Sequence, residues 1–252
     1  MSTPPVTAPA WATATPYAAA LSTGRGPLFL RRTDGWLLPL EVERWCARAD
    51  AVDRAVLDRC EGTVLDVGCG PGRLVAELAA RGRAVLGIDI SEAAVDQTVR
   101  RGGQALRRSV FEPLPGERRW GTVLLMDGNV GIGGDPRALL DRVAGLLRPG
   151  GLLIAETAPV DVDERAQVQV VDLTGTGNGA DDPFPWARLG TRALLRYAQG
   201  WDEAGQWTAG GRRFAALRSR SASSSAEPPK RTAVISSQRA RNTSAGNPVP
   251  DR

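Results

Sequence analysis

A glycine-rich turn between two apolar segments, within residues 62–90, constrains the fold of this 252-residue chain more than any other feature. An apolar run with the character of a buried strand leads into Gly68, Gly70 and Gly72. Apolar residues at helical spacing follow, and a second apolar strand ends in Asp89. This order predicts a βαβ unit whose first turn can hold a ligand close to the main chain, because glycine has no Cβ.

The acid at the end of the second strand indicates a ligand that contains a nucleoside. An ionised carboxylate offers only hydrogen-bond acceptors, so Asp89 can accept from two neighbouring ribose hydroxyls. The Gly-x-Gly-x-x-Gly spacing of dinucleotide sites is not met, because Arg73 stands where the third glycine is required. No Gly-Lys-Ser/Thr sequence follows the turn, which excludes a phosphate-binding P-loop.

The string Leu-Asp-Val-Gly-Cys-Gly-Pro-Gly at 65–72 closely resembles the first motif of class I S-adenosylmethionine-dependent methyltransferases. The turn Pro149-Gly150-Gly151, which precedes an apolar strand, is a second feature typical of this family. The resemblance covers about residues 40–218. It implies a doubly wound, mostly parallel seven-stranded α/β sheet with helices on both faces, and it implies S-adenosyl-L-methionine as the cofactor.

The resemblance also implies cofactor contacts on the turn and at the ends of the neighbouring strands. Asp66 is expected to help hold the turn and the methionine ammonium group, and Asp89 to bind the ribose. The acid usual after the third strand is missing, since Ser109 stands near its place. The expected cofactor-binding residues are Asp66, Gly68, Cys69, Gly70, Gly72, Asp89, Ile90, Val110, Phe111 and Asp127.

Polar residues follow the apolar strand 122–126, and ligands in open α/β sheets bind beyond the carboxyl ends of the strands. Asp127 is therefore the candidate catalytic base if the acceptor is a hydroxyl, because a carboxylate would then have to take its proton. A turn-stabilising carboxylate is the alternative for Asp127. Asn129 and Glu156 are the candidate acceptor-binding residues, with a solvated position as the alternative for Glu156.

Composition excludes several kinds of chemistry. The chain has no histidine, which removes imidazole bases and histidine-bound metals. Its three cysteines lack Cys-x-x-Cys spacing, so neither a zinc site nor a disulfide framework is indicated, and no metal is expected. The net charge of +4 equals the excess of six basic over two acidic residues within 219–252, so the rest of the chain is neutral and nucleic-acid binding is not indicated.

The two ends of the chain differ from its middle. Residues 1–16 and 219–252 are rich in small and polar residues and in proline, and they are predicted to be disordered. Residues 17–61 are expected to form cap segments that either cover the cofactor or only pack on the sheet. Residues 62–218 are expected to form the methyltransferase domain. No apolar run reaches membrane-spanning length and no secretory signal is recognisable, so a cytoplasmic protein is expected.

Three further segments bear on the acceptor side. A hairpin is predicted at 28–39, and the alternation of valine with polar residues predicts a half-buried strand at 167–173. A loop is predicted at 174–188. Its Phe184-Pro185-Trp186 sequence fits either a lid over the acceptor or a plug at the edge of the sheet.

The favoured function is methyl transfer from S-adenosylmethionine to an unidentified, small-molecule acceptor. One alternative is a nicotinamide-dependent oxidoreductase on the same βαβ unit, which the glycine spacing and Asp66 disfavour. A second alternative is a noncatalytic protein that binds the cofactor. Neither the acceptor nor the oligomeric state is predicted by the sequence.

Overall fold

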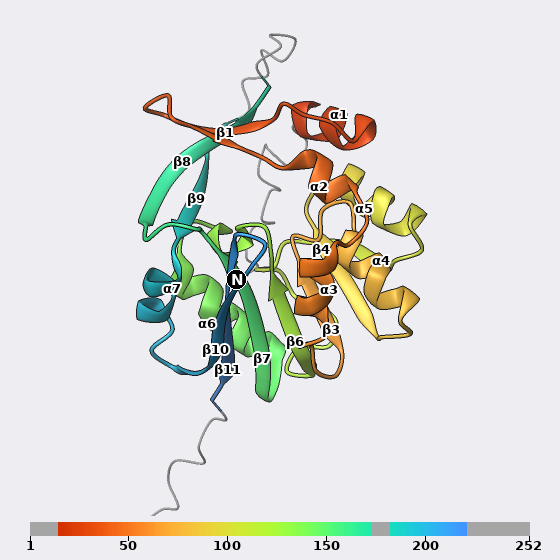
Figure 1. Cartoon of the computed structure of the whole chain (residues 1–252), viewed down its shortest axis with the longest axis vertical. Helices are drawn as coiled ribbons and strands as arrows, with labels where there is room; N and C mark the ends of the chain where they lie inside the picture. The colour runs from red at the N-terminus through yellow and green to blue at the C-terminus, as the bar shows by residue number, and fades with distance from the viewer. Residues whose placement is uncertain (1–14, 173–181, 221–252) are drawn as a thin grey trace, which may run out of the picture. The chain divides into compact units, whose positions relative to one another are not determined.

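The computed structural model of the chain describes residues 15–172 and 182–220. Its main sheet has seven strands in the order β10-β11-β7-β6-β3-β4-β5 (Figure 1). Strands β7, β6, β3, β4 and β5 are parallel, whereas β11 is antiparallel to both of its neighbours. This topology confirms the predicted sheet. The bounds are β3 (Val64–Val67), β4 (Val85–Asp89), β5 (Ala105–Arg107), β6 (Trp120–Leu125), β7 (Leu147–Thr157), β10 (Trp201–Ala209) and β11 (Arg212–Ser219).

Helices cover both faces of the main sheet (Figure 1). On β6, Val123 and Leu125 belong to the same buried cluster as Leu139, while Leu124 packs in a second cluster with Leu74. This alternation follows from the two-residue period of a strand, which turns successive side chains to opposite faces. The sheet is doubly wound, as predicted. The helices around it are α3 (Ala51–Leu57), α4 (Arg73–Ala80), α5 (Glu92–Arg100), α6 (Pro136–Leu146) and α7 (Thr191–Tyr197).

Side-chain caps determine where three of these helices begin. Asp50, Ser91 and Asp135 each accept a hydrogen bond from a main-chain N–H in the first turn of α3, α5 and α6. In α3 the cap is reciprocal, because the Asp53 side chain also accepts from the N–H of Asp50. The caps of α5 and α6 therefore define the lengths of the loops that leave the ends of β4 and β6.

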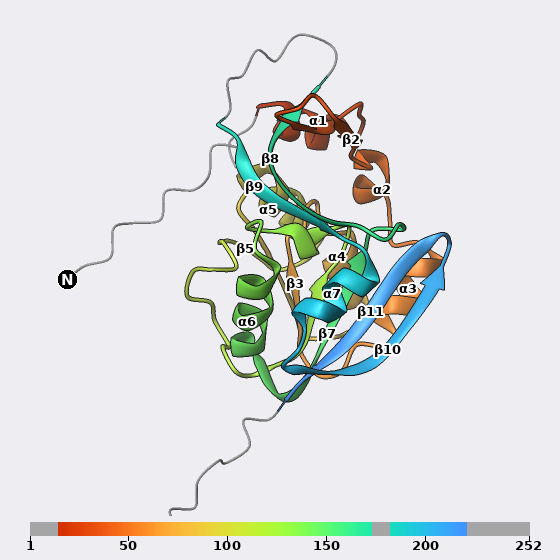
Figure 2. The ribbon, with the colours of Figure 1, turned by 90° about the vertical axis from the view of Figure 1, so that its left-hand side faces the viewer.

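A second, antiparallel sheet with the order β2-β1-β8-β9 lies above the main sheet (Figure 2). It joins distant parts of the chain, since Leu30 pairs with Val170. Its side chains pack with Ala20 and Val42 of two helices. We call these six elements the lid. Their bounds are α1 (Thr15–Thr23), β1 (Phe29–Arg32), β2 (Leu37–Pro39), α2 (Val42–Cys46), β8 (Asp163–Val171) and β9 (Phe184–Leu189).

The lid differs from its sequence-based description in two respects. The hairpin at 28–39 is present as β1 and β2, but it pairs with β8, and β8 begins at Asp163 rather than at residue 167. The lid also combines N-terminal segments with residues 163–189, so the cover of the main sheet is not confined to the predicted cap segments 17–61.

Several predictions concern parts of the chain outside the described residues. The predicted disorder of 1–16 and 219–252 lies outside them at 1–14 and 221–252, whereas residues 15–16 begin α1 and residue 219 ends β11. The end of the predicted strand 167–173 and the start of the predicted loop 174–188 lie outside them at 173–181, and the prediction of a loop is wrong for residues 184–188, which belong to β9. Strand β5 ends at Arg107, which leaves the segment after it as a loop at the rim of the sheet. Within the ranges that the structure describes, none of the helices has the length and apolar character needed to cross a membrane.

Candidate active site

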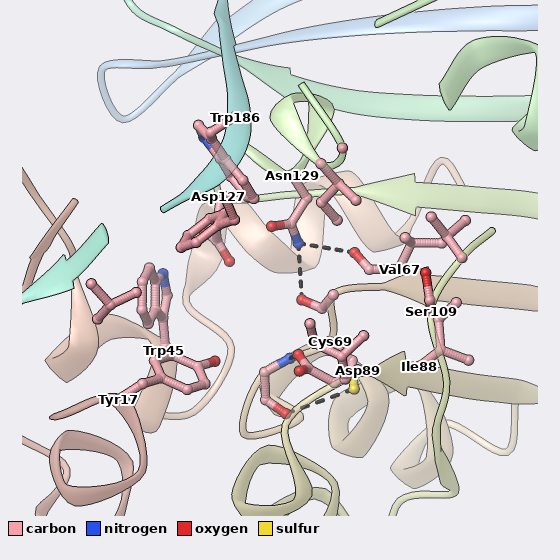
Figure 3. Close-up of a pocket in the computed structure, with 18 of the residues that line it drawn as sticks. Tyr17, Trp45, Val67, Cys69, Ile88, Asp89, Ser109, Asp127, Asn129 and Trp186 are labelled. Atoms are coloured by element: carbon pink, nitrogen blue, oxygen red, sulfur yellow. Dashed lines mark hydrogen bonds between the residues drawn. The ribbon is translucent and has the colours of Figure 1, made fainter. Parts of the chain in front are cut away.

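A pocket of about 400 Å³ lies between the lid and the carboxyl ends of β3, β4 and β6 (Figure 3). Its volume is within the usual range of small-molecule sites. One wall comes from the main sheet and its loops: Val67, Gly68, Cys69, Gly70, Pro71, Ile88, Asp89, Ile90, Arg108, Ser109, Val110 and Phe111. The other wall comes from the lid: Tyr17, Leu30, Leu40, Trp45, Val170, Phe184, Pro185 and Trp186. Between them lie Arg73, Asp127, Asn129, Ile132 and Gly133.

The glycine turn presents its main chain to the pocket and is tied to Asp89. Gly68 and Gly70 have left-handed φ angles of 68° and 52°, which glycine adopts without a Cβ clash. The Gly70 N–H donates to Asp89 Oδ2 at 2.9 Å, and the Ser91 N–H donates to Asp89 Oδ1 at 2.8 Å. Burial raises the pKa of Asp89, and these donors oppose the rise. Since a carboxylate has about four acceptor positions, Asp89 retains acceptors for a ligand.

Asn129 joins the loop after β6 to the glycine turn. Its Nδ2 donates to the carbonyl oxygens of Val67 and Gly68, both at 2.9 Å. The two N–H groups of the amide are thereby used. Asn129 lines the pocket, and the atom that it can offer to a ligand is the Oδ1 acceptor (Figure 3).

Two residues of the expected cofactor set, Asp66 and Gly72, do not line the pocket. Gly72 has a φ of 81°, and a Cβ at this position would lie 2.4 Å from Thr98 Oγ1. The same hydroxyl donates to the Gly70 carbonyl at 2.9 Å. The missing Cβ of Gly72 therefore leaves room for Thr98 of α5 to hold the turn by this hydrogen bond. Asp66 is buried in β3, where burial raises its pKa to about 7 against the opposing charge of Arg73.

Asp127 is surrounded by three arginines. Its carboxylate lies 2.6 Å from Arg73, 2.7 Å from Arg44 and 3.8 Å from Arg212. Burial alone raises the pKa of Asp127, but these cations outweigh burial and lower it. A carboxylate that is stabilised in its charged form accepts a proton poorly. This environment argues against the expected role of Asp127 as a general base, although the residue lines the pocket.

The ion-pair network continues behind the pocket. Arg73 Nε lies 2.9 Å from Asp53, and Arg212 lies 2.8 Å from Asp53 and 2.7 Å from Glu156. Burial raises the pKa of Asp53, but the two arginines lower it to about 2. Glu156 also accepts the N–H of Asp127 at 3.0 Å. Glu156 does not line the pocket, so the structure places it as a counter-charge to Arg212 rather than as an acceptor contact.

Four of the eight lid residues that line the pocket are aromatic. Tyr17 and Trp45 meet edge to face with ring centroids 6.5 Å apart, and Phe184 and Trp186 do so at 6.2 Å. Figure 3 places Tyr17 and Trp45 on the opposite side of the pocket from Ser109. Trp186 belongs to an edge strand of the lid and also lines the pocket, a position that is compatible with both of the roles considered for this segment.

Most of the sequence-predicted site residues meet in this pocket, whereas Arg73 and the aromatic pair from the N-terminal segment were not foreseen. Arg73 follows the last glycine of the turn and is 4% exposed. A buried arginine requires counter-charges, but no local spacing indicates that they come from residues 53 and 127. The predicted residues that line the pocket are Gly68, Cys69, Gly70, Asp89, Ile90, Val110, Phe111, Asp127 and Asn129.

The doubly wound sheet, with a glycine turn after β3 and an acid at the end of β4, defines a class I methyltransferase fold. A sequence profile described as a methyltransferase domain matches residues 41–208. The chain belongs to this family. The prediction of a class I S-adenosylmethionine-dependent methyltransferase is confirmed, and no feature of the match favours the oxidoreductase.

A curated relative is similar to part of the chain. The ubiquinone biosynthesis O-methyltransferase of Nitrosomonas europaea is 33% identical over 116 residues. The similar stretch comprises 44% of this chain and 49% of the relative. The chain therefore spans about half the length of this relative.

Solved structures share the fold. A S-adenosylmethionine-dependent methyltransferase from Bacteroides fragilis, in complex with S-adenosylhomocysteine, has a TM-score of 0.66 at 22% identity. The match covers 83% of this chain and 96% of that one. The glycopeptide N-methyltransferase MtfA, complexed with S-adenosylhomocysteine, has a TM-score of 0.52 at 16% identity, over 69% of this chain and 90% of that one.

Proposed function

We propose that the protein transfers a methyl group from S-adenosylmethionine to an oxygen atom of a small molecule held in this pocket. The observation that carries the proposal is the position of Asp89, a buried carboxylate at the end of β4 that is tied to the Gly70 N–H and keeps acceptors for two ribose hydroxyls. The relative from Nitrosomonas europaea is named an O-methyltransferase, which supports oxygen as the accepting atom.

The main-sheet wall fits the parts of this cofactor in chain order. We assign the ribose to Asp89 and the methionine portion to the main chain of Gly68 and Gly70, where no Cβ stands between backbone and ligand. The adenine is assigned to the loop of Val110 and Phe111, and residue Phe111 is 45% exposed. Ile90 and Cys69 complete this wall, and Asp66 is assigned to holding the turn from within β3.

The reaction requires little covalent chemistry from the protein. S-adenosylmethionine supplies a methyl group on a sulfonium, which is an activated leaving group. The task of the chain is to orient the acceptor toward that methyl group and to exclude water. Lid residues from distant segments, such as Tyr17, Leu30 and Val170, line the pocket and provide an apolar enclosure for an acceptor. Asn129 lies between the two walls, and we assign it to the place where the cofactor and the acceptor meet.

Calorimetric titration tests the cofactor assignment. We expect saturable binding of S-adenosylmethionine and S-adenosylhomocysteine and no heat of binding with NAD. Binding of NAD in their place would favour the oxidoreductase. The absence of binding by either sulfur ligand would contradict the proposal.

The noncatalytic alternative makes a different prediction. It requires cofactor binding without turnover for any acceptor. Incubation with S-adenosylmethionine labelled in its methyl group, followed by extraction of small-molecule products, separates the two. Transfer of label to any extracted acceptor excludes the noncatalytic protein.

A further inference from the structure

We infer that Gln97 and Arg101 of α5 are positioning residues of the cofactor site, and we call these two residues the latch. They hold the lid helices α1 and α2 over the glycine turn, so that the cofactor enters and leaves only after their hydrogen bonds to the lid have broken. The inference rests on the proposed function and adds a regulation of the same site. Two observations carry it: the hydrogen bonds of α5 and the position of Tyr17.

The latch binds both lid helices through main-chain carbonyl oxygens. Gln97 Nε2 donates to the carbonyl of Leu21 in the last turn of α1. Arg101 donates to the carbonyls of Cys46 and, at 3.1 Å, Ala47, where α2 ends. The last carbonyls of a helix have no partner within the helix, so they are available to such donors. Because the guanidinium is charged, its hydrogen bonds are stronger than those between neutral groups.

The same helix also holds the glycine turn. Thr98 Oγ1 donates to the Gly70 carbonyl at 2.9 Å, and Ser91, the N-cap of α5, donates its N–H to Asp89 Oδ1 at 2.8 Å. Thr98 and the latch residues lie within about one turn of each other on α5. One helix therefore sets the separation between the lid and the turn that is assigned to the cofactor.

The two lid helices carry aromatic rings over that turn. Tyr17 of α1 and Trp45 of α2 both line the pocket and meet edge to face. The Tyr17 hydroxyl lies 3.8 Å from a Cβ built on Gly70, and Figure 3 shows it pointing toward the side of the pocket where Cys69 and Asp89 lie. A cofactor bound on the glycine turn is therefore covered by this part of the lid, and it leaves when the lid helices move.

The latch can be changed without altering the residues that contact the ligand, because neither of its residues lines the described pocket. The second attachment of α2, the 2.7 Å ion pair between Arg44 and Asp127, does lie at the pocket. A change there would also disturb Arg73, which shares Asp127. Gln97 and Arg101 are therefore the positions at which the lid can be loosened selectively.

The rates of ligand exchange test the latch. Surface plasmon resonance of the immobilised full chain gives the association and dissociation rate constants of S-adenosylhomocysteine. A weaker latch increases the fraction of time for which the lid is open, and both rate constants scale with that fraction. We expect Arg101→Leu to raise both about tenfold, with an affinity that changes less than threefold.

Two further variants separate the latch from a general loss of structure. Arg101→Lys keeps a cation that can donate to the same carbonyl oxygens, and we expect its rate constants to lie closer to the wild type than those of Arg101→Leu. Arg100→Leu, at a neighbouring side chain that is 74% exposed, is the matched control and should change neither rate constant more than twofold.

Two results for Arg101→Leu would overturn the inference. The first is a pair of rate constants equal to those of the control variant. The second is faster dissociation with unchanged association, because a damaged binding site weakens affinity in this way, whereas a loosened lid speeds both directions.

Gln97→Glu tests the other half of the latch and remains informative if Arg101→Leu does not fold. It keeps the shape of the side chain but places carboxylate oxygens against the Leu21 carbonyl oxygen. We expect both rate constants to rise at least threefold. Unchanged rate constants in this variant would remove α1 from the latch and overturn the inference as stated.

The wild-type measurement distinguishes this inference from the proposed function. If S-adenosylhomocysteine does not bind the wild-type protein, the proposed function itself fails. If it binds, but the latch variants exchange it at the wild-type rates, only the latch is wrong.

Discussion

Asn129 occupies the space that a side chain on residue 68 would need: a Cβ built on Gly68 would lie 2.6 Å from Asn129 Nδ2. The missing Cβ lets the amide reach the carbonyl oxygens of Val67 and Gly68. The loop after β6 thus holds the turn after β3, although the two lie about 60 residues apart in the sequence. We expect the shape of the turn, and with it cofactor affinity, to depend on this contact.

Replacing Asn129 tests that dependence. Asn129→Asp keeps the shape but places carboxylate oxygens against two carbonyl oxygens, while Asn129→Ser only removes the contact. We expect S-adenosylhomocysteine to bind at least tenfold more weakly to the aspartate variant, with the serine variant intermediate, because a lost hydrogen bond costs about 1 kcal/mol and an unfavourable charge costs more. Calorimetric affinities equal to that of the wild type would contradict the role of Asn129.

The glycine at residue 72 is predicted to be needed for packing and not only for its backbone angle. Gly72→Ala introduces a Cβ 2.4 Å from Thr98 Oγ1, whereas Gly82, with a φ of 71°, has nothing within 4 Å of a built Cβ. We expect Gly82→Ala to cost about 1–2 kcal/mol from the left-handed backbone alone. Gly72→Ala should cost about 1–3 kcal/mol more through overpacking. Urea unfolding of both variants measures the difference, and equal losses would show that Thr98 moves aside freely.

Asp127 is predicted to act mainly as the counter-charge of its arginines. Asp127→Asn should destabilise the fold by about 3 kcal/mol, because buried Arg73 loses one of its two carboxylate partners and keeps only Asp53. Asparagine tolerates the positive φ of 57° at this position, so the backbone adds little to the loss. The control is Asp58→Asn, whose exposed ion pair with Arg81 should contribute less than about 0.5 kcal/mol. Similar unfolding free energies for the two variants would argue that Asp127 is free for another role.

The buried carboxyl of Asp66 predicts a pH dependence of stability. Its pKa is raised by burial to about 7 from an ordinary value of 3.8. Between these values the folded chain binds more protons than the unfolded chain, so the contribution of Asp66 to stability is present at low pH and is lost as the pH rises toward 7.

Asp66→Asn removes this titration. Relative to the wild type, the variant should gain stability on the order of 2 kcal/mol between pH 5 and pH 8, because other titrating groups cancel in the comparison. Urea unfolding of both proteins at the two pH values provides the measurement. A difference that does not change with pH would mean that Asp66 keeps an ordinary pKa in the folded protein.

The main sheet could be predicted because its signals are local. The sequence signals for it lie within 30 residues: the three glycines, the apolar strands and Asp89. The glycine turn and Asp89 do meet in the structure, where the Gly70 N–H donates to the Asp89 carboxylate. Caps such as Asp50 are also local, since they bind main-chain groups within one turn.

The lid and the ion-pair network could not be predicted in this way. Leu30 and Val170 pair across 140 residues, and Arg212 reaches Asp53 across 159. Such partners are selected by the tertiary fold, not by spacing in the chain. For the same reason Glu156 was expected at the acceptor, because its place at the end of β7 is visible in the sequence and its partner Arg212 is not.

The most direct test of the account is the affinity for S-adenosylhomocysteine of an Asp89→Asn variant, measured by calorimetry beside the wild type. Asparagine has a similar shape but only one acceptor oxygen, so it cannot both hold the Gly70 and Ser91 N–H groups and accept from two ribose hydroxyls. Glu92→Gln, at an acid whose side chain is 74% exposed, is the control. We predict an affinity at least tenfold weaker for Asp89→Asn and unchanged for Glu92→Gln. Equal affinities for the wild type and both variants would contradict the assignment of this pocket to the cofactor.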